Sequence, residues 1–141
     1  MAHQHRDEVT VFAPATVANL GQGFDILGLA LSGPGGEVVA RRARGHEVTL
    51  ASVEGDGGAL PRSAEANTAG IAARETLRKA GIEVGVELEV RKGLPIGSGL
   101  GSSAASAAAA ALAVNRLVGS PLRKAELVGP CVEAEAAVSG R

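Results

Sequence analysis

The sequence predicts an α+β fold in which a mixed or antiparallel sheet packs against helices. Three strand-like segments fall within the first 55 residues, before the first helical segment. A fourth, at residues 83–91, follows that helix and leads to an alanine-rich helix. This order favours α+β over a doubly wound sheet. With 141 residues, of which 45% are hydrophobic, the chain fits one domain at residues 9–141, preceded by a flexible tail at residues 1–8.

The three early strands are predicted from alternation and turn residues. Residues 9–12 alternate in type, and this strand is expected to stop at Pro14. Residues 37–43 and 46–53 form a plausible hairpin around an Arg-Gly turn, although the first of them carries arginines where a core face is expected. Two glycine-containing stretches are predicted as loops: 19–25 and 32–36.

The helices are predicted from capping residues and composition. Asn67 can cap a helix that runs to residue 80, with Gly81 in the usual C-terminal place. Residues 102–118 hold eight alanines, and such a helix can sit in the centre of a fold because neighbouring backbone approaches it closely. A Ser-Pro pair at residues 120–121 is expected to start a last helix, which breaks or kinks at Pro130.

The strand at residues 83–91 alternates apolar and charged residues, which suits one wet face. After it, three glycines fall within five residues, and two serines open the alanine-rich helix. Glycines let the backbone approach a ligand, and the free amides of a helix's first turn attract phosphate. Serine hydroxyls can bond a phosphate oxygen or ligate Mg²⁺. The predicted phosphate loop consists of Pro95, Ile96, Gly97, Ser98, Gly99, Leu100, Gly101, Ser102, Ser103, Ala104 and Ala105.

The generic phosphate-binding patterns do not describe this loop. A Walker loop requires a lysine that is missing here, and a dinucleotide fingerprint requires glycine where Ser102 stands. A simple glycine- and serine-rich turn before a helix is the alternative interpretation.

A second informative stretch spans residues 14–31, where polar groups stand among apolar ones. Asn19 offers an amide and Asp25 a carboxylate, both near glycines, so they could hold a small polar substrate. The alternative is an Asx-turn with an aspartate that only stabilises the loop.

Composition excludes several classes of partner and compartment. A net charge of −1 and a content of two Phe with no Trp or Tyr argue against nucleic-acid binding. No stretch fits a signal peptide or a membrane span. The single cysteine, Cys131, cannot form an internal disulfide, which fits a reducing compartment. We therefore expect a cytoplasmic protein that does not bind membranes.

The glycine loop resembles the ATP-binding motif of the GHMP kinases, whose N-terminal domain has the ribosomal protein S5 domain 2-like fold. The stretch Ala-Asn-Leu-Gly-x-Gly-Phe-Asp-x-Leu-Gly-Leu-Ala-Leu, at residues 18–31, further resembles the homoserine kinases within that superfamily. The resemblance runs from about residue 9 to residue 140. It implies phosphorylation of the side-chain hydroxyl of L-homoserine by ATP, giving O-phospho-L-homoserine on the route to threonine.

The resemblance also implies roles for individual residues. Asp25 is expected to pair with the amino group of the substrate, with Asn19 bonding nearby. Asn67 falls where the family lines its adenine pocket, and the glycine loop would hold the phosphates. Ser103 and Glu135 match the family's magnesium ligands. The resemblance identifies no catalytic base, because direct attack by the substrate hydroxyl is open.

Related enzymes are roughly twice as long as this chain and continue into a C-terminal domain. We therefore expect an N-terminal ATP-binding portion whose C-terminal domain is absent from this chain, so that the isolated chain is inactive or nearly so. Its last helix would expose an apolar face. Another GHMP small-molecule kinase and a non-catalytic nucleotide-binding fragment remain alternatives, and a homodimer, common in the family, is left open.

Overall fold

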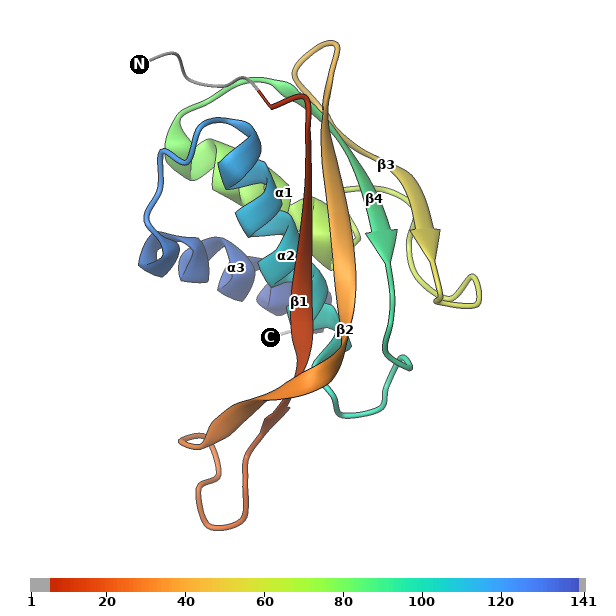
Figure 1. Cartoon of the computed structure of the whole chain (residues 1–141), viewed down its shortest axis with the longest axis vertical. Helices are drawn as coiled ribbons and strands as arrows, with labels where there is room; N and C mark the ends of the chain where they lie inside the picture. The colour runs from red at the N-terminus through yellow and green to blue at the C-terminus, as the bar shows by residue number, and fades with distance from the viewer. Residues whose placement is uncertain (1–5, 140–141) are drawn as a thin grey trace.

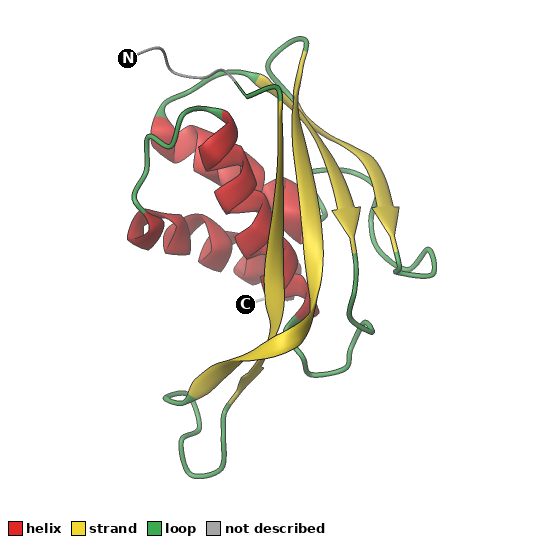
Figure 2. Cartoon of the chain, in the orientation of Figure 1, coloured by secondary structure: helices red, strands yellow, loops and turns green. Residues whose placement is uncertain are grey.

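A computed structural model describes residues 6–139, so most of the predicted N-terminal tail lies outside the described residues. A four-stranded sheet is covered on one face by helices (Figures 1 and 2). This arrangement confirms the predicted α+β class. The elements are β1 (Glu8–Ala18), β2 (Gly28–Ala43), β3 (Val48–Glu54), α1 (Thr68–Ala80), β4 (Gly85–Arg91), α2 (Ser102–Leu117), the 3₁₀ helix η1 (Lys124–Leu127) and α3 (Val128–Ser139).

The strand order is β1-β2-β4-β3, which makes the sheet mixed. β1 pairs antiparallel with β2 and β2 antiparallel with β4, whereas β3 pairs parallel with β4. The predicted hairpin between β2 and β3 is therefore wrong, because β4 lies between them. The chain reaches β4 from β3 through α1, the kind of crossover that a parallel pair requires.

β1 and β2 form a longer ribbon than predicted, and both predicted interruptions are wrong. β1 continues through Pro14, and its register with β2 shifts between Pro14 and Thr16. β1 is an edge strand, where a proline that cannot donate a hydrogen bond is tolerated. The predicted loop at residues 32–36 belongs to β2. There a side chain on Gly35 would overlap the Ala13 carbonyl oxygen and the Phe12 ring.

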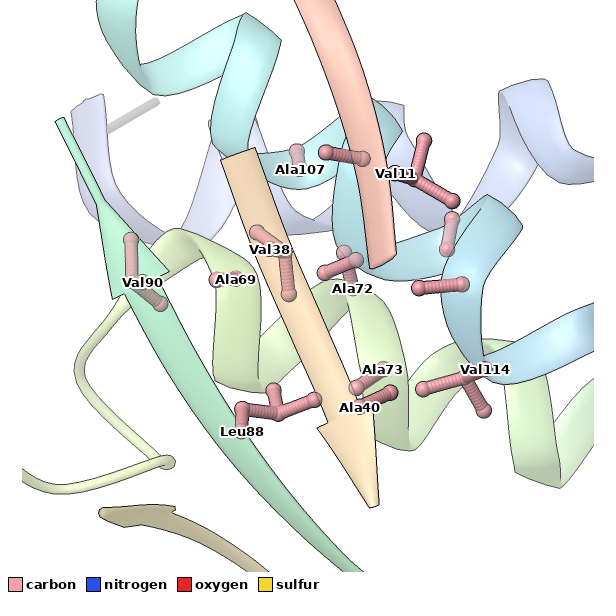
Figure 3. Close-up of a cluster of buried hydrophobic side chains, with 14 of the residues drawn as sticks. Val11, Val38, Ala40, Ala69, Ala72, Ala73, Leu88, Val90, Ala107 and Val114 are labelled. Carbon is pink, nitrogen blue, oxygen red and sulfur yellow. The ribbon is translucent and has the colours of Figure 1, made fainter. Parts of the chain in front are cut away.

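The core lies between the sheet and the helices and is built from small side chains (Figure 3). The apolar face of β4 is fully buried, as its alternation predicted. α2 packs against α1, β1 and β2, which confirms its predicted central place. The alanines make this close approach possible. Labelled members of the core are Val11, Val38, Ala40, Ala69, Ala72, Ala73, Leu88, Val90, Ala107 and Val114.

The end of α1 follows local capping chemistry, whereas the predicted start of the last helix at residues 120–121 is wrong, because the chain becomes helical only at Lys124. Gly81 adopts φ 67° and ends α1 as predicted, and Arg42 donates from Nη2 to the Leu117 carbonyl at the end of α2. The arginine on the inner face of β2 thus bonds the last turn of α2. The predicted break at Pro130 is wrong, because Pro130 lies in the first turn of α3, where its missing N–H costs no helical hydrogen bond.

α3 exposes apolar side chains, as expected, with Val128, Val132 and Val138 about half exposed. With α2 it forms an open groove of about 770 Å³ whose lining is mostly apolar. Across residues 6–139 no helix has the length and apolar character needed to span a membrane.

Candidate functional site

The glycine loop connects β4 to α2 and has the backbone geometry of an anion cradle. Gly97, Gly99 and Gly101 have φ of 71°, 74° and 68°, in the left-handed region that glycine adopts most easily. Gly101 is also the N-cap of α2 and supplies no side-chain cap. The first-turn amides of α2 therefore keep their hydrogen-bonding capacity for a ligand.

A pocket of about 320 Å³ opens on this loop. Of the predicted loop residues, Pro95, Leu100, Ala104 and Ala105 do not line it. The lining consists of Leu60, Lys92, Ile96, Gly97, Ser98, Gly99, Gly101, Ser102 and Ser103. Most of the predicted loop therefore surrounds one cavity.

Lys92 is a cation in this pocket that the sequence analysis did not single out. Its Nζ donates to the Ser102 carbonyl at 3.1 Å. Burial lowers the pKa of Lys92, while the nearby carboxylates of Glu135 and Asp56 act in the opposite direction. The available signal was a lysine at the end of a strand that leads directly into a phosphate loop.

Ser103 and Glu135, the predicted magnesium ligands, meet although 32 residues separate them. The Ser103 hydroxyl donates to both carboxylate oxygens of Glu135, at 2.7 and 2.9 Å. Hydroxyl and carboxylate oxygens suit Mg²⁺, which commonly takes one or two protein ligands together with phosphate oxygens and water. The Ser103–Glu135 pair fits that donor set. Within residues 6–139 there is no group of three or more acidic, His or Cys side chains that could hold a metal by themselves.

Ser102 provides a second indication that a ligand belongs in this pocket. Its hydroxyl oxygen is buried and has no hydrogen-bond partner among the described residues. A buried hydroxyl without a partner is costly, and a bound phosphate oxygen would satisfy it.

Asn19 and Asp25 lie together in the loop between β1 and β2, at the tip of an arm that projects beyond the helices (Figure 1). Both have positive φ, 58° and 60°, and the Asp25 amide donates to Asn19 Oδ1 at 2.8 Å. Asn19 thus shapes the loop through its side chain, but the bond spans six residues, so it is not the Asx-turn of the alternative interpretation. In the described part of the chain, the Asp25 carboxylate has no hydrogen bond or ion pair and is exposed to solvent.

Thr16 links this arm to the glycine loop and was also missed from the sequence. Its amide donates to the Leu100 carbonyl at 2.9 Å. A side chain on Gly101 would overlap Thr16 Oγ1. The base of the arm and the start of α2 are therefore packed without spare room.

Asn67, predicted to line the adenine pocket, is 3% exposed and does not line the glycine-loop pocket. Its Oδ1 accepts from the Ala69 amide at 3.0 Å, and its Nδ2 donates to the Pro61 carbonyl at 3.0 Å. The side chain both caps α1, as predicted, and fixes the loop before it.

We expect Asn67→Ala to lower the free energy of unfolding by about 2 kcal/mol, because it removes a cap and leaves the Pro61 carbonyl without its partner. Asn67→Ser keeps an acceptor for the cap and should lose about half as much. Urea unfolding measures both changes. Equal stability of the two variants would show that the cap contributes nothing, and parent-like stability of Asn67→Ser would show the same for the bond to Pro61.

Comparison with known proteins gives the family. The model of the GHMP kinases N terminal domain matches residues 67–141, more than half of the chain. A homoserine kinase of Arabidopsis thaliana is 52% identical over 136 residues, which cover 94% of this chain and 37% of that protein. The crystal structure of homoserine kinase from Cytophaga hutchinsonii matches with a TM-score of 0.95 and 43% identity, over 100% of this chain and 45% of that chain.

A more distant match concerns the fold alone. The mevalonate kinase of Methanococcus jannaschii has a TM-score of 0.70 at 17% identity, over 92% of this chain and 46% of that one.

The chain spans between 37% and 44% of the length of the curated relatives that it matches. The family model covers α1 to α3 in full, and the homoserine kinase structure matches the whole chain. The chain therefore belongs to the GHMP kinase family, of which it represents the N-terminal domain.

Proposed function

We propose that this chain is the nucleotide-binding part of a homoserine kinase, which transfers a phosphoryl group from ATP to the side-chain hydroxyl of L-homoserine in threonine biosynthesis. The observation that carries the proposal is the hydrogen bond between Thr16 and Leu100, which joins an arm with an unpaired carboxylate to an anion cradle. The high identity to proteins named homoserine kinase supports this acceptor over mevalonate or a sugar.

In this proposal the glycine loop binds the triphosphate through the amides at the start of α2, and Lys92 adds a positive charge beside it. Ser103 and Glu135 would hold Mg²⁺, which neutralises charge on the phosphates. Phosphoryl transfer depends mainly on positioning and on such neutralisation, so amides and a lysine can supply much of the protein's part.

The Asp25 carboxylate would bind the ammonium group of homoserine, and the side-chain nitrogen of Asn19 would donate a hydrogen bond to the substrate nearby. Asn67 would contribute through the loop that it fixes, since both ends of its side chain already have partners. No carboxylate or histidine lines the described part of the pocket, so we assign no base. We propose that the hydroxyl attacks the γ-phosphorus directly, that ADP leaves, and that the hydroxyl proton passes to an oxygen of the transferred phosphoryl group.

The second candidate function is nucleotide binding without turnover, and the chain's share of its relatives' length favours it for the isolated polypeptide. We expect the purified chain to bind ATP with Mg²⁺ and to form little or no phosphohomoserine.

Titration calorimetry with ATP, followed by homoserine or mevalonate, tests both statements together with a product assay. Binding of mevalonate but not homoserine would contradict the proposed acceptor. Robust phosphohomoserine formation that Asp25→Ala abolishes would show instead that the isolated chain is a complete enzyme.

A further inference from the structure

The loop between β3 and α1 is organised around Asp56, a carboxylate that the sequence analysis did not single out. Its side chain is only 2% exposed. It accepts hydrogen bonds from the amides of Leu60, at 2.9 Å, and Gly58, at 3.1 Å. Arg62 adds a third bond through Nη2 at 3.2 Å. The Leu60 bond is the largest cause lowering the pKa of Asp56 to about 2, against the opposing effect of burial, so the carboxylate is ionised at neutral pH.

This loop forms one wall of the glycine-loop pocket. Leu60 lines the pocket directly. At the base of the loop, the Lys92 amide donates to the Glu54 carbonyl at 2.8 Å, and a side chain on Gly55 would overlap the Lys92 carbonyl. Leu60 and Lys92, the lining residues outside the loop at residues 95–105, are therefore held by the same segment.

The chemistry of Leu60 indicates which part of a nucleotide would face it. An isobutyl side chain has no hydrogen-bonding group, so it cannot bind a triphosphate. It can pack against the flat face of a base or the carbon edge of a ribose. The phosphates have the amides of α2 and the cation of Lys92 instead.

We propose that Asp56 is a positioning residue for the nucleotide, which holds Leu60 as the apolar wall on which the nucleoside part of ATP rests. The inference rests on the proposed function, because it requires the glycine loop to bind the triphosphate. It adds a residue that acts on the nucleoside through Leu60.

The test compares two ligands, ATP and inorganic tripolyphosphate, each titrated with Mg²⁺ into the chain. In Asp56→Asn, an amide NH₂ group replaces one of the oxygens that accept from the Gly58 and Leu60 amides. In Leu60→Ala, the apolar side chain is removed while the hydrogen bonds of Asp56 remain. Both variants should weaken ATP binding about tenfold and change tripolyphosphate binding less than about twofold. Glu65→Gln, an exposed carboxylate in the same loop paired with Arg74, is the matched control and should change neither.

Thermal unfolding confirms that each variant is folded. Unchanged ATP affinity in Leu60→Ala, or equal weakening of both ligands in both variants, would overturn the role of the Asp56 loop. If the parent chain binds neither ligand, the proposed function fails first and the inference with it. If it binds ATP no more tightly than tripolyphosphate, the nucleoside wall is absent and only the inference fails.

Discussion

Replacing Gly101 with alanine is expected to weaken ATP binding by at least about tenfold and to lower the free energy of unfolding by more than the 1–2 kcal/mol that a left-handed alanine costs. The residue stands at φ 68° and its new methyl group would overlap Thr16 Oγ1. Relief of that overlap must move either the arm or the first turn of α2. Both moves disturb the amides that are proposed to hold the phosphates.

The matched control is Gly81→Ala, at φ 67° with open space around the new methyl group. It has the same backbone cost without the overlap, so it should lose about 1–2 kcal/mol of stability and keep its ATP affinity. Thr16→Ala in the Gly101→Ala background removes the overlapping hydroxyl and should restore part of both losses, which a double-mutant cycle measures. Parent-like affinity in Gly101→Ala would show that this contact does not set the geometry of the cradle.

Features that depend on neighbouring residues could be predicted from the sequence. Asn67 and Gly81 end α1 where capping chemistry requires, and the alternation in β4 identifies its buried face. The three alternating glycines predict a loop whose backbone can approach a ligand, and all three adopt positive φ before α2. In each case the deciding interactions lie within about one helical turn or along one strand.

Features that depend on distant pairing could not be predicted. Nothing local shows that β4 inserts between β2 and β3, since a short turn also suits a hairpin. Pro14 and Pro130 predict breaks from local chemistry alone. Neither breaks its element, because Pro14 lies in an edge strand and Pro130 in the first turn of α3. The partners of Asp56 follow from a loop fold that has no simple sequence signature.

The contact between Ser103 and Glu135 also depends on residues far apart in the sequence, and only the family resemblance indicates it. Their contact requires α3 to start before Pro130 and to pack across α2. A lone glutamate on a helix is usually solvated, so residue type and spacing alone would not have selected Glu135.

Glu135→Gln is expected to abolish the dependence of ATP affinity on Mg²⁺. With Mg²⁺ present, the variant should bind ATP at least about tenfold more weakly than the parent, because a carboxylate ligand is replaced by a neutral amide. In EDTA the variant should bind ATP as tightly as the parent or more tightly. The reason is that the parent then holds an uncompensated negative charge beside the polyanionic nucleotide. The glutamine oxygen can still accept from Ser103, so the packing of α3 on α2 is expected to persist.

Glu133→Gln provides the same charge change two positions earlier on α3, beside the pocket that faces α1, and should leave both affinities unchanged. Ser103→Ala should weaken ATP binding with Mg²⁺ but show no gain in EDTA, because it removes a ligand and no charge. Titrations of the four proteins with and without Mg²⁺ therefore separate a metal-binding carboxylate from one that only anchors Ser103. An anchoring role alone would make Glu135→Gln behave alike in both conditions, and would place any metal elsewhere in the pocket.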